Sequence, residues 1–323
     1  MLRPALAVFV ALATLLAPAS VRAVPCAPRH IADIPLHNDG LFLNAPVILD
    51  GRQARFILDT GSEGSLITPE AAGALRLSPD PAHATMIQGP NGRGQLAPNL
   101  LIRALSLGLI PFGQRSIPLG ALPGVPMLSP PIAGLMGVDL LGSYDIEFDV
   151  RQQRLSLWLP SPGSLANGHS SPGRVPAGSV ACMPGPAWPQ GYTTLRTRRE
   201  GARLAVSFSL DGHEGTALID SGARSHILSR RFAHSMGITD DILRRDQGGV
   251  TSGVDLNARW YHWHHFHALH LLEEKPGTGN PIWKDPVLTV SDMRDGADML
   301  LGADWFAQHS IWISFSAGQV WVR

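Results

Sequence analysis

The sequence is poor in cysteine and in lysine. It contains two cysteines, Cys26 and Cys182, and two lysines, Lys275 and Lys284, so that arginine carries nearly all of the positive charge. Two cysteines this far apart exclude a disulfide-rich scaffold and do not form a metal site by themselves. They either form one disulfide or stay as unpaired thiols, and the sequence leaves both alternatives open.

An excess of charge of either sign is also missing. The chain has 26 Lys and Arg residues against 26 Asp and Glu residues. A neutral chain lacks the excess of basic residues that would attract nucleic acids or anionic membranes, so we expect neither as a partner. Beyond the N-terminus, no apolar run is long and uncharged enough for a transmembrane helix.

The N-terminus is typical of a secretory signal peptide. Residues 1–23 combine a positive start at Arg3, a short apolar core and the small-residue cleavage site Val21-Arg22-Ala23. The apolar core is shorter than the roughly 20 residues that span a bilayer, although a retained anchor is the alternative. We therefore expect a protein exported to the periplasm or the medium, without stable membrane insertion.

One short motif occurs twice. Phe56–Ser62 reads Phe-Ile-Leu-Asp-Thr-Gly-Ser, and Ala217–Ala223 reads Ala-Leu-Ile-Asp-Ser-Gly-Ala. In each copy an apolar run, typical of a buried strand, ends in one carboxylate, Asp59 or Asp220. Asp-Thr-Gly alone is a weak signal, because these residues are also common in turns.

The surroundings of the motif repeat as well. An Asp-Gly pair, a strong hairpin signal, lies nine residues before each Asp, at Asp50-Gly51 and at Asp211-Gly212. Thr68 and Ser229 are candidate helix N-caps after the two motifs. The blocks around Gly137 and Gly302 repeat with nearly the spacing of Asp59 and Asp220, namely 165 (302 − 137) against 161 (220 − 59) residues. These matches indicate an internal duplication.

The duplication defines the expected domains. Residues 24–159 and 192–323 form two halves, and residues 160–191 join them with a segment rich in Pro, Gly, Ser and Ala that has the composition of a linker. A Cys26–Cys182 disulfide would tie the mature N-terminus to this linker.

The two motifs, each followed by an apolar-apolar-Gly-x-Asp block, resemble the retropepsin-like aspartic proteases. The resemblance covers each half once, and implies an all-β, bilobal acid-protease fold of two fused retropepsin-like lobes with short helices. It also implies that Asp59 and Asp220 are the catalytic pair. The residues after them, Thr60, Gly61, Ser221 and Gly222, would support it.

The same resemblance implies two flaps that close over a peptide, here with Gln88 and Gly89 in the first half and Thr251 and Ser252 in the second. Neither flap carries the tyrosine of pepsin-type enzymes. Glu63 matches the acidic residue that holds the substrate backbone in retropepsins, but its counterpart is Arg224. We expect Arg224 near the pair, where it would lower a carboxyl pKa or bind an acidic group.

Two carboxyl groups in close contact share a proton, because both cannot ionise at low cost. The ionised partner then activates a water and the protonated one supplies the acid. The sequence thus predicts a monomeric aspartic endopeptidase that acts on peptides without a cofactor. A catalytically weak or inactive peptide-binding module on the same fold is the alternative.

A third hypothesis depends on the segment Arg259–His270, which contains five histidines. On a strand, His262 and His264 share one face and His265 and His267 the other, a spacing that could bind a metal. The segment lacks the His-Glu-x-x-His arrangement of zinc hydrolases. A half-exposed aromatic strand is the simpler interpretation, and no metal is predicted.

Overall fold

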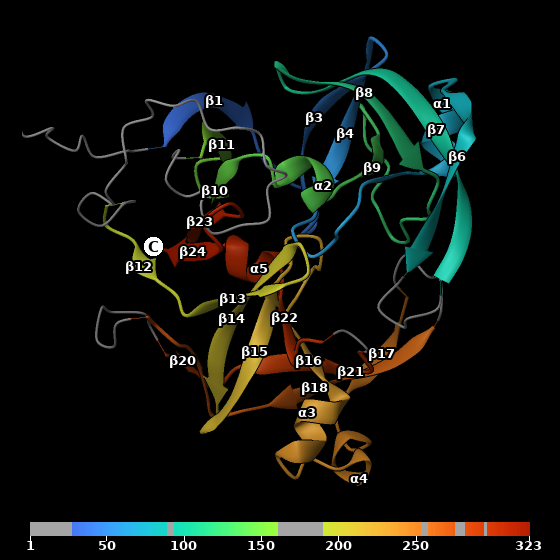
Figure 1. Cartoon of the computed structure of the whole chain (residues 1–323). Helices are drawn as coiled ribbons and strands as arrows, with labels where there is room; N and C mark the ends of the chain where they lie inside the picture. The colour runs from blue at the N-terminus through green and yellow to red at the C-terminus, as the bar shows by residue number, and fades with distance from the viewer. Residues whose placement is uncertain (1–27, 89–93, 161–189, 253–257, 275–281, 294–295) are drawn as a thin grey trace, which may run out of the picture.

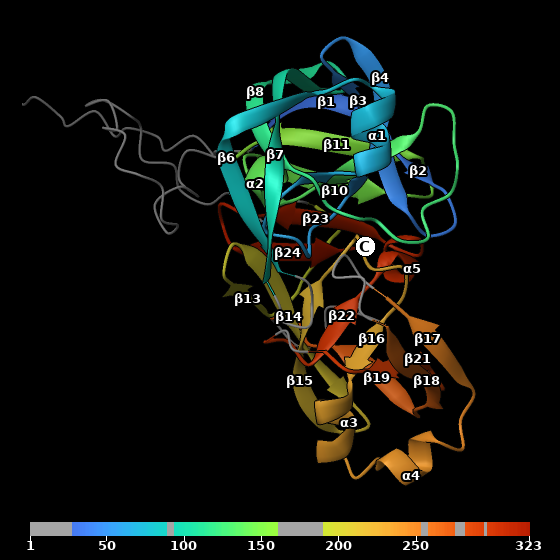
Figure 2. The same ribbon diagram turned by 90° about the vertical axis from the view of Figure 1, so that its right-hand side faces the viewer.

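A computed structural model describes residues 28–88, 94–160, 190–252, 258–274, 282–293 and 296–323. These residues form two β-rich lobes and a sheet between them, as Figures 1 and 2 show. The mainly β, bilobal fold expected from the sequence is confirmed. The signal segment, both cysteines, Gly89 and nearly all of the linker lie outside the described residues.

The first lobe is an eight-stranded sheet in which β4 lies between β9 and β3, and β3 continues to β7 and β6. Strand β4 runs parallel to β9, and all the other pairs are antiparallel. Its strands are β2 (His37–Asn38), β3 (Leu43–Leu49), β4 (Arg52–Leu58), β5 (Leu66–Ile67), β6 (Ser78–Gln88), β7 (Gly94–Leu107), β8 (Ile110–Pro118) and β9 (Ile132–Met136).

The second lobe is a ten-stranded sheet that repeats this plan around β15, which lies between β14 and the parallel strand β22. Its strands are β13 (Thr197–Glu200), β14 (Arg203–Leu210), β15 (His213–Ile219), β16 (Ile227–Ser229), β17 (Gly248–Thr251), β18 (Arg259–His265), β19 (Ala268–Leu271), β20 (Trp283–Lys284), β21 (Val287–Ser291) and β22 (Met299–Leu301).

A six-stranded antiparallel sheet joins the two halves, in the order β1, β11, β10, β23, β24, β12. At its centre, Glu147 pairs with Trp312, which is its counterpart in the duplication. The pseudo-two-fold axis of the duplication therefore passes between these two residues. The strands are β1 (Arg29–Pro35), β10 (Asp145–Asp149), β11 (Arg154–Leu159), β12 (Thr193–Thr194), β23 (Ser310–Ser314) and β24 (Gln319–Val322).

Both Asp-Gly pairs form the predicted hairpin turns. Asp50 and Gly51 have φ of 48° and 81°, and Asp211 and Gly212 have φ of 48° and 84°. Positive φ at both central residues is the signature of a type I′ turn, whose twist matches that of the flanking strands. Each turn places the following strand, β4 or β15, so that it ends at the motif.

The helices are short and two of them begin at the predicted caps. Thr68 accepts a hydrogen bond from the Ala71 N–H and Ser229 from the Phe232 N–H, at 3.2 and 3.1 Å. These side chains satisfy backbone donors that a helix start leaves free. The helices are α1 (Pro69–Ala74), α2 (Val138–Leu141), α3 (Arg230–Ser235), α4 (Asp240–Leu243) and α5 (Ala303–Phe306). No helix in the described ranges has the length and apolarity to cross a membrane.

Two sequence predictions about strands were wrong. The Gly and Asn content of residues 86–94 predicts an irregular turn, yet Met86–Gln88 end strand β6, because the ladder to β7 continues to Gln88 and Gly94. The histidine-rich segment is also not one strand. It turns at Phe266 and His267 between β18 and β19, so His267 does not share a strand face with His265.

Candidate active site

The two motif carboxylates lie where the central strands of the two lobes end. Strand β4 delivers Asp59 and strand β15 delivers Asp220. The Asp59 N–H donates to the Met136 carbonyl at 2.9 Å, and the Asp220 N–H donates to the Leu301 carbonyl at 3.0 Å. Each Asp is therefore held by the strand that precedes the Gly137 or the Gly302 block.

The hydroxyl residues of the two motifs join the lobes beneath these carboxylates. The Thr60 N–H donates to Ser221 Oγ at 3.0 Å, and the Ser221 N–H donates to Thr60 Oγ1 at 3.1 Å. In turn, Thr60 Oγ1 donates to the Ile219 carbonyl and Ser221 Oγ to the Leu58 carbonyl, at 2.7 and 2.6 Å. Both side chains are almost fully buried. Four hydrogen bonds thus fix one motif against the other.

The motif glycines allow the carboxyl groups to approach each other. A Cβ atom added to Gly61 would lie 2.3 Å from the carboxyl carbon of Asp220, and one added to Gly222 would lie 2.4 Å from that of Asp59. Such contacts are shorter than any non-bonded carbon pair tolerates. Each Asp therefore occupies the space that a side chain on the opposite motif would need.

The two carboxyl groups share a hydrogen bond and form a dyad. Burial, followed by the negative charge of Asp220, raises the pKa of Asp59 well above its ordinary value. Burial also raises the pKa of Asp220, against hydrogen bonds from the Ala223 and Gly222 N–H groups that lower it. Because two adjacent carboxylates repel each other, the dyad retains one proton at pH values where an isolated Asp is ionised.

Arg203, at the start of β14, is the arginine that acts on the dyad. Its charge lowers the pKa of Asp220, and its Nη1 donates to the Gly61 carbonyl at 3.1 Å. The sequence analysis assigned this role to Arg224 and missed Arg203. The one sequence signal for Arg203 is its position at the start of the strand that leads into the second Asp-Gly turn. No residue of the Asp-Ser-Gly motif points to it.

Arg224 and Glu63 instead reach across to the opposite lobe. Arg224 Nε donates to the Gly40 carbonyl at 3.1 Å and its guanidinium lies 5.2 Å from the centre of the Phe42 ring. Glu63 Oε1 accepts from the Ala202 N–H at 3.2 Å. Glu63 and Arg224 are equivalent positions of the two halves, and the turns that they contact, at Ala202 and Gly40, are also equivalent. Both contacts hold the lobes together. Direct binding of substrate by either residue stays a prediction.

The expected flaps correspond to two strand hairpins, β6–β7 and β17–β18, which both lie on the right-hand side of Figure 1. Gln88 ends β6, Thr251 ends β17 and Ser252 follows it. Contacts of these residues with a peptide are likewise untested predictions.

Two small apolar clusters, distinct from the main core, lie beside β4 and β15, the strands that end at the dyad. Each contains the residue two positions before the motif Asp, Ile57 or Leu218. Leu66 in the first cluster matches Ile227 beside the second. The first cluster is the bulkier one, with Phe42, Ile132 and Leu135 buried and Leu122, Val125 and Leu128 packed on it, whereas the second has Ala297 and Leu300 buried and Ala223, Ile227 and Met293 packed on it.

The described histidines do not assemble a metal centre. Within the described residues, no three His, Cys, Asp or Glu side chains gather as ligands. His262 and His264 share a strand face as predicted, but His264 Nδ1 contacts Asp246 at 2.7 Å.

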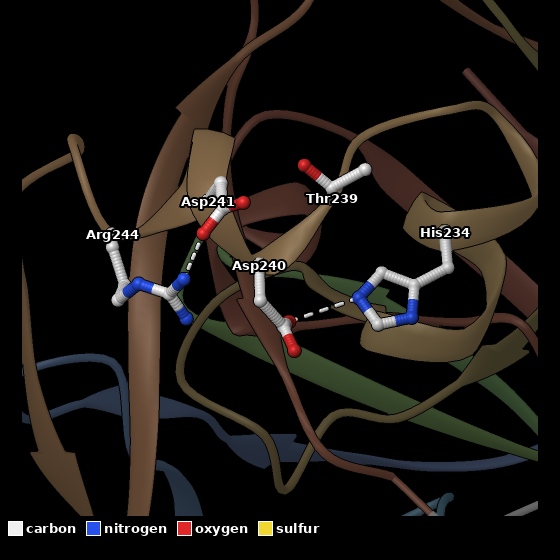
Figure 3. A pocket seen from close by; sticks show the side chains of 5 residues that line it. All are labelled: His234, Thr239, Asp240, Asp241 and Arg244. Atoms are coloured by element: carbon white, nitrogen blue, oxygen red, sulfur yellow. Dashed lines mark hydrogen bonds and ion pairs between the residues drawn. The ribbon is translucent and has the colours of Figure 1, made fainter.

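A surface hollow in Figure 3 lies on α3 and α4, at the far end of the second lobe from the first. Its acidic side chains are paired with basic ones. Asp240 accepts from His234 at 2.9 Å, and Asp241 contacts Arg244. It contains no residue of the dyad.

Comparison with known proteins agrees with this geometry for the first lobe. The family model for aspartyl protease matches residues 45–140, which include Asp59, the first hairpin and the Gly137 block. The crystal structure of Basic 7S globulin from soybean aligns with a TM-score of 0.43 and 12% identity over 92% of this chain and 95% of that chain. No curated protein matches. Residues 45–140 therefore match the aspartyl protease family, and the resemblance seen in the sequence is confirmed for this part of the chain.

Proposed function

We propose that this chain is an aspartic endopeptidase that hydrolyses peptide bonds with a water activated between Asp59 and Asp220. The observation that carries the proposal is the dyad itself. Two carboxyl groups from duplicated motifs share a hydrogen bond, and burial together with their mutual charge raises the pKa of Asp59. One protonated and one ionised carboxyl group is the state that acid–base catalysis by such a pair needs.

The proposed reaction uses each carboxyl group once as acid and once as base. The ionised carboxylate takes a proton from water as the water oxygen bonds to the peptide carbonyl carbon, and the protonated carboxyl group gives its proton to the carbonyl oxygen. In the second step the carboxyl group that is now protonated gives its proton to the amine nitrogen as the C–N bond breaks. A hydroxyl group of the tetrahedral intermediate gives its proton to the other, ionised carboxylate as the C=O bond re-forms, so that the dyad returns to its starting state. The rigid cross-link through Thr60 and Ser221 supports this chemistry, because it keeps the two groups in register.

One chain supplies both aspartates, so the dyad needs no second copy, which supports action as a monomer. We further propose export, on the sequence of residues 1–23 alone, and catalysis without a metal or cofactor, because the dyad provides both the acid and the base.

The test is a digest of a peptide library from pH 3 to pH 8 by the mature protein and by its Asp59→Asn variant. We expect the wild type to cut a subset of peptides and the variant to cut none at comparable protein concentration. Cleavage that survives in Asp59→Asn would reject the dyad. Peptide binding by both proteins without cleavage at any pH would favour the alternative, a binding module.

A further inference from the structure

The residue six positions after each motif Asp differs between the two halves. It is Ser65 in the first half and His226 in the second. Ser65 Oγ donates to Asp139 Oδ1 at 2.7 Å and accepts from the Gly137 N–H at 3.0 Å. A hydroxyl group thus ties the first motif loop (residues 59–65) to the Gly137 block that follows it in the same half.

In the second half, an imidazole ties the motif loop (residues 220–226) to the Gly302 block. His226 Nδ1 is hydrogen-bonded to Asp304 Oδ2, and the backbone N–H of His226 donates to the same oxygen at 3.2 Å. Because an ionised carboxylate only accepts hydrogen bonds, Nδ1 is the donor. The side chain of His226 is nine-tenths buried, and its Nε2 has no hydrogen-bond partner among the described residues. The bond to Asp304 is therefore the polar contact that orients the ring.

The ring of His226 also packs against aromatic side chains. It lies edge-on to Trp283 of β20, with 5.2 Å between the ring centres and 88° between the ring planes. Trp283 contacts the ring of His309 at 5.8 Å, and His309 contacts Trp305 of α5 at 5.6 Å. His226 thus makes two kinds of contact, a hydrogen bond to the Gly302 block and packing against β20.

The hydrogen bond to Asp304 lies next to the bonds that orient the Asp220 carboxylate. The Ala303 N–H donates to the Ala223 carbonyl at 2.7 Å, and the Ala223 N–H donates to Asp220 Oδ1 at 2.9 Å. Asp304 follows Ala303 directly in the chain. A displacement of Asp304 would therefore reach the Asp220 carboxylate through only two hydrogen bonds.

We propose that His226 is a positioning residue for the catalytic carboxylate of Asp220. Its hydrogen bond to Asp304 holds the second motif loop, and with it Asp220, in register with the first motif. The packing of the ring on Trp283 stabilises the lobe but does not set the geometry of the dyad. This inference rests on the proposed function, because it concerns the same pair of carboxyl groups.

Two variants separate the hydrogen bond from the packing. His226→Phe keeps an aromatic ring against Trp283 but cannot donate to Asp304. His226→Ser loses the ring but supplies the hydroxyl group with which the first half makes the same tie. We expect His226→Phe to lower kcat by about 10- to 100-fold with little change in KM, because a shift of about 1 Å in a reacting group costs up to this much. His226→Ser should stay close to the wild type in kcat.

The pH–rate profile distinguishes positioning from a general loss of stability. Burial, followed by the negative charge of Asp220, raises the pKa of Asp59, and the basic limb reports the loss of the proton that the dyad shares. If the two carboxyl groups move apart, their repulsion weakens and the basic limb moves to lower pH. We expect this movement for His226→Phe and not for His226→Ser.

Leu243→Ala is the control for lost stability, because Leu243 is fully buried in α4, at the far end of the second lobe from the first. It should lower the free energy of unfolding and leave the basic limb in place. If Leu243→Ala moved the limb as far as His226→Phe does, the effect would be general and the inference would fail. It would also fail if His226→Phe matched the wild type and His226→Ser did not, since ring packing would then be responsible.

A titration of the carboxyl groups separates this inference from the proposed function. Carbon NMR follows Asp59 and Asp220 in the wild type and in both His226 variants, with the Asp→Asn changes as assignments. If the wild type shows a raised pKa but cuts no peptide, the catalytic proposal fails, and a lower pKa in His226→Phe alone still supports the positioning role. An unchanged titration in His226→Phe would overturn it. So would a wild type in which neither carboxyl group titrates above the ordinary range of Asp.

Discussion

At the residue scale, the site depends on the absence of a side chain beside each carboxyl group. Gly61 lies against Asp220 and Gly222 lies against Asp59, with no room for even a methyl group. The sequence implied, through its resemblance to the family, that these glycines support the catalytic pair. It could not show that the atom approached is the carboxyl group of the other lobe, because that contact joins residues about 160 positions apart.

Gly61→Ala should therefore displace the Asp220 carboxyl group and lower kcat/KM by at least about 100-fold, since a shift of about 1 Å in a reacting group costs this much. Steady-state kinetics on one cleaved peptide measures the loss. Gly64→Ala is the control, because an added Cβ there meets no atom within 4 Å. Full activity of Gly61→Ala would show that the dyad is not packed as described.

Arg203→Ala should move the acidic limb of the pH–rate profile upward. The positive charge of Arg203 favours the ionised form of Asp220 and lowers its pKa, so its removal raises the pH at which the dyad loses its first proton. Arg203→Lys, which keeps the charge, should move the limb less. Arg224→Ala should leave it in place, and a larger shift from Arg224→Ala than from Arg203→Ala would contradict this assignment.

At the element scale, local signals located the two strands that end at the motifs, both Asp-Gly turns and two of the five described helix starts. The Asp-Gly turns and the caps Thr68 and Ser229 follow from residue type, which acts over a few positions. The end of β6 was not predicted, because its pairing with β7 extends to Gln88 and Gly94, beside a Gly- and Asn-rich segment that gives no local strand signal.

Between the elements, the two motifs are joined by the hydrogen-bonded cross-link of Thr60 and Ser221. Ser221→Ala removes the acceptor of the buried Thr60 N–H and should lower the free energy of unfolding by about 1–3 kcal/mol. Denaturant unfolding measures this change. Ser221→Thr keeps the hydroxyl group in the form that the first motif uses and should be close to wild type. Equal losses in both variants would attribute the effect to packing instead.

At the scale of the whole molecule, the six-stranded sheet makes the two halves one unit. The duplication predicted two similar lobes, but not that β10 would pair with β23 across the pseudo-two-fold axis. Nothing local in either strand specifies its partner, because both alternate in the same way and many registers would bury their apolar faces. The partner is set by the symmetry that also brings Asp59 to Asp220.

This sheet should make stability depend on pH. Burial raises the pKa of Asp145, in β10, to about 6. Folding therefore favours the protonated form of Asp145. The contribution of this group to the free energy of unfolding is complete below about pH 4 and is lost as the pH rises through 6. From a free-chain value of 3.8 the loss is about 3 kcal/mol. Asp145→Asn should lack this loss and exceed wild-type stability at pH 7, as measured by urea unfolding at pH 4 and pH 7. The same pH dependence in both proteins would refute it.

The most direct test of the account is a double-mutant cycle on the dyad, with kcat for one cleaved peptide measured for wild type, Asp59→Asn, Asp220→Asn and the double variant. Because the two carboxyl groups act as one unit, each single change should remove nearly all activity, and the double variant should be no more than slightly slower than either. If the two losses added, or if one variant kept substantial activity, Asp59 and Asp220 would not share one catalytic proton and the account would be wrong.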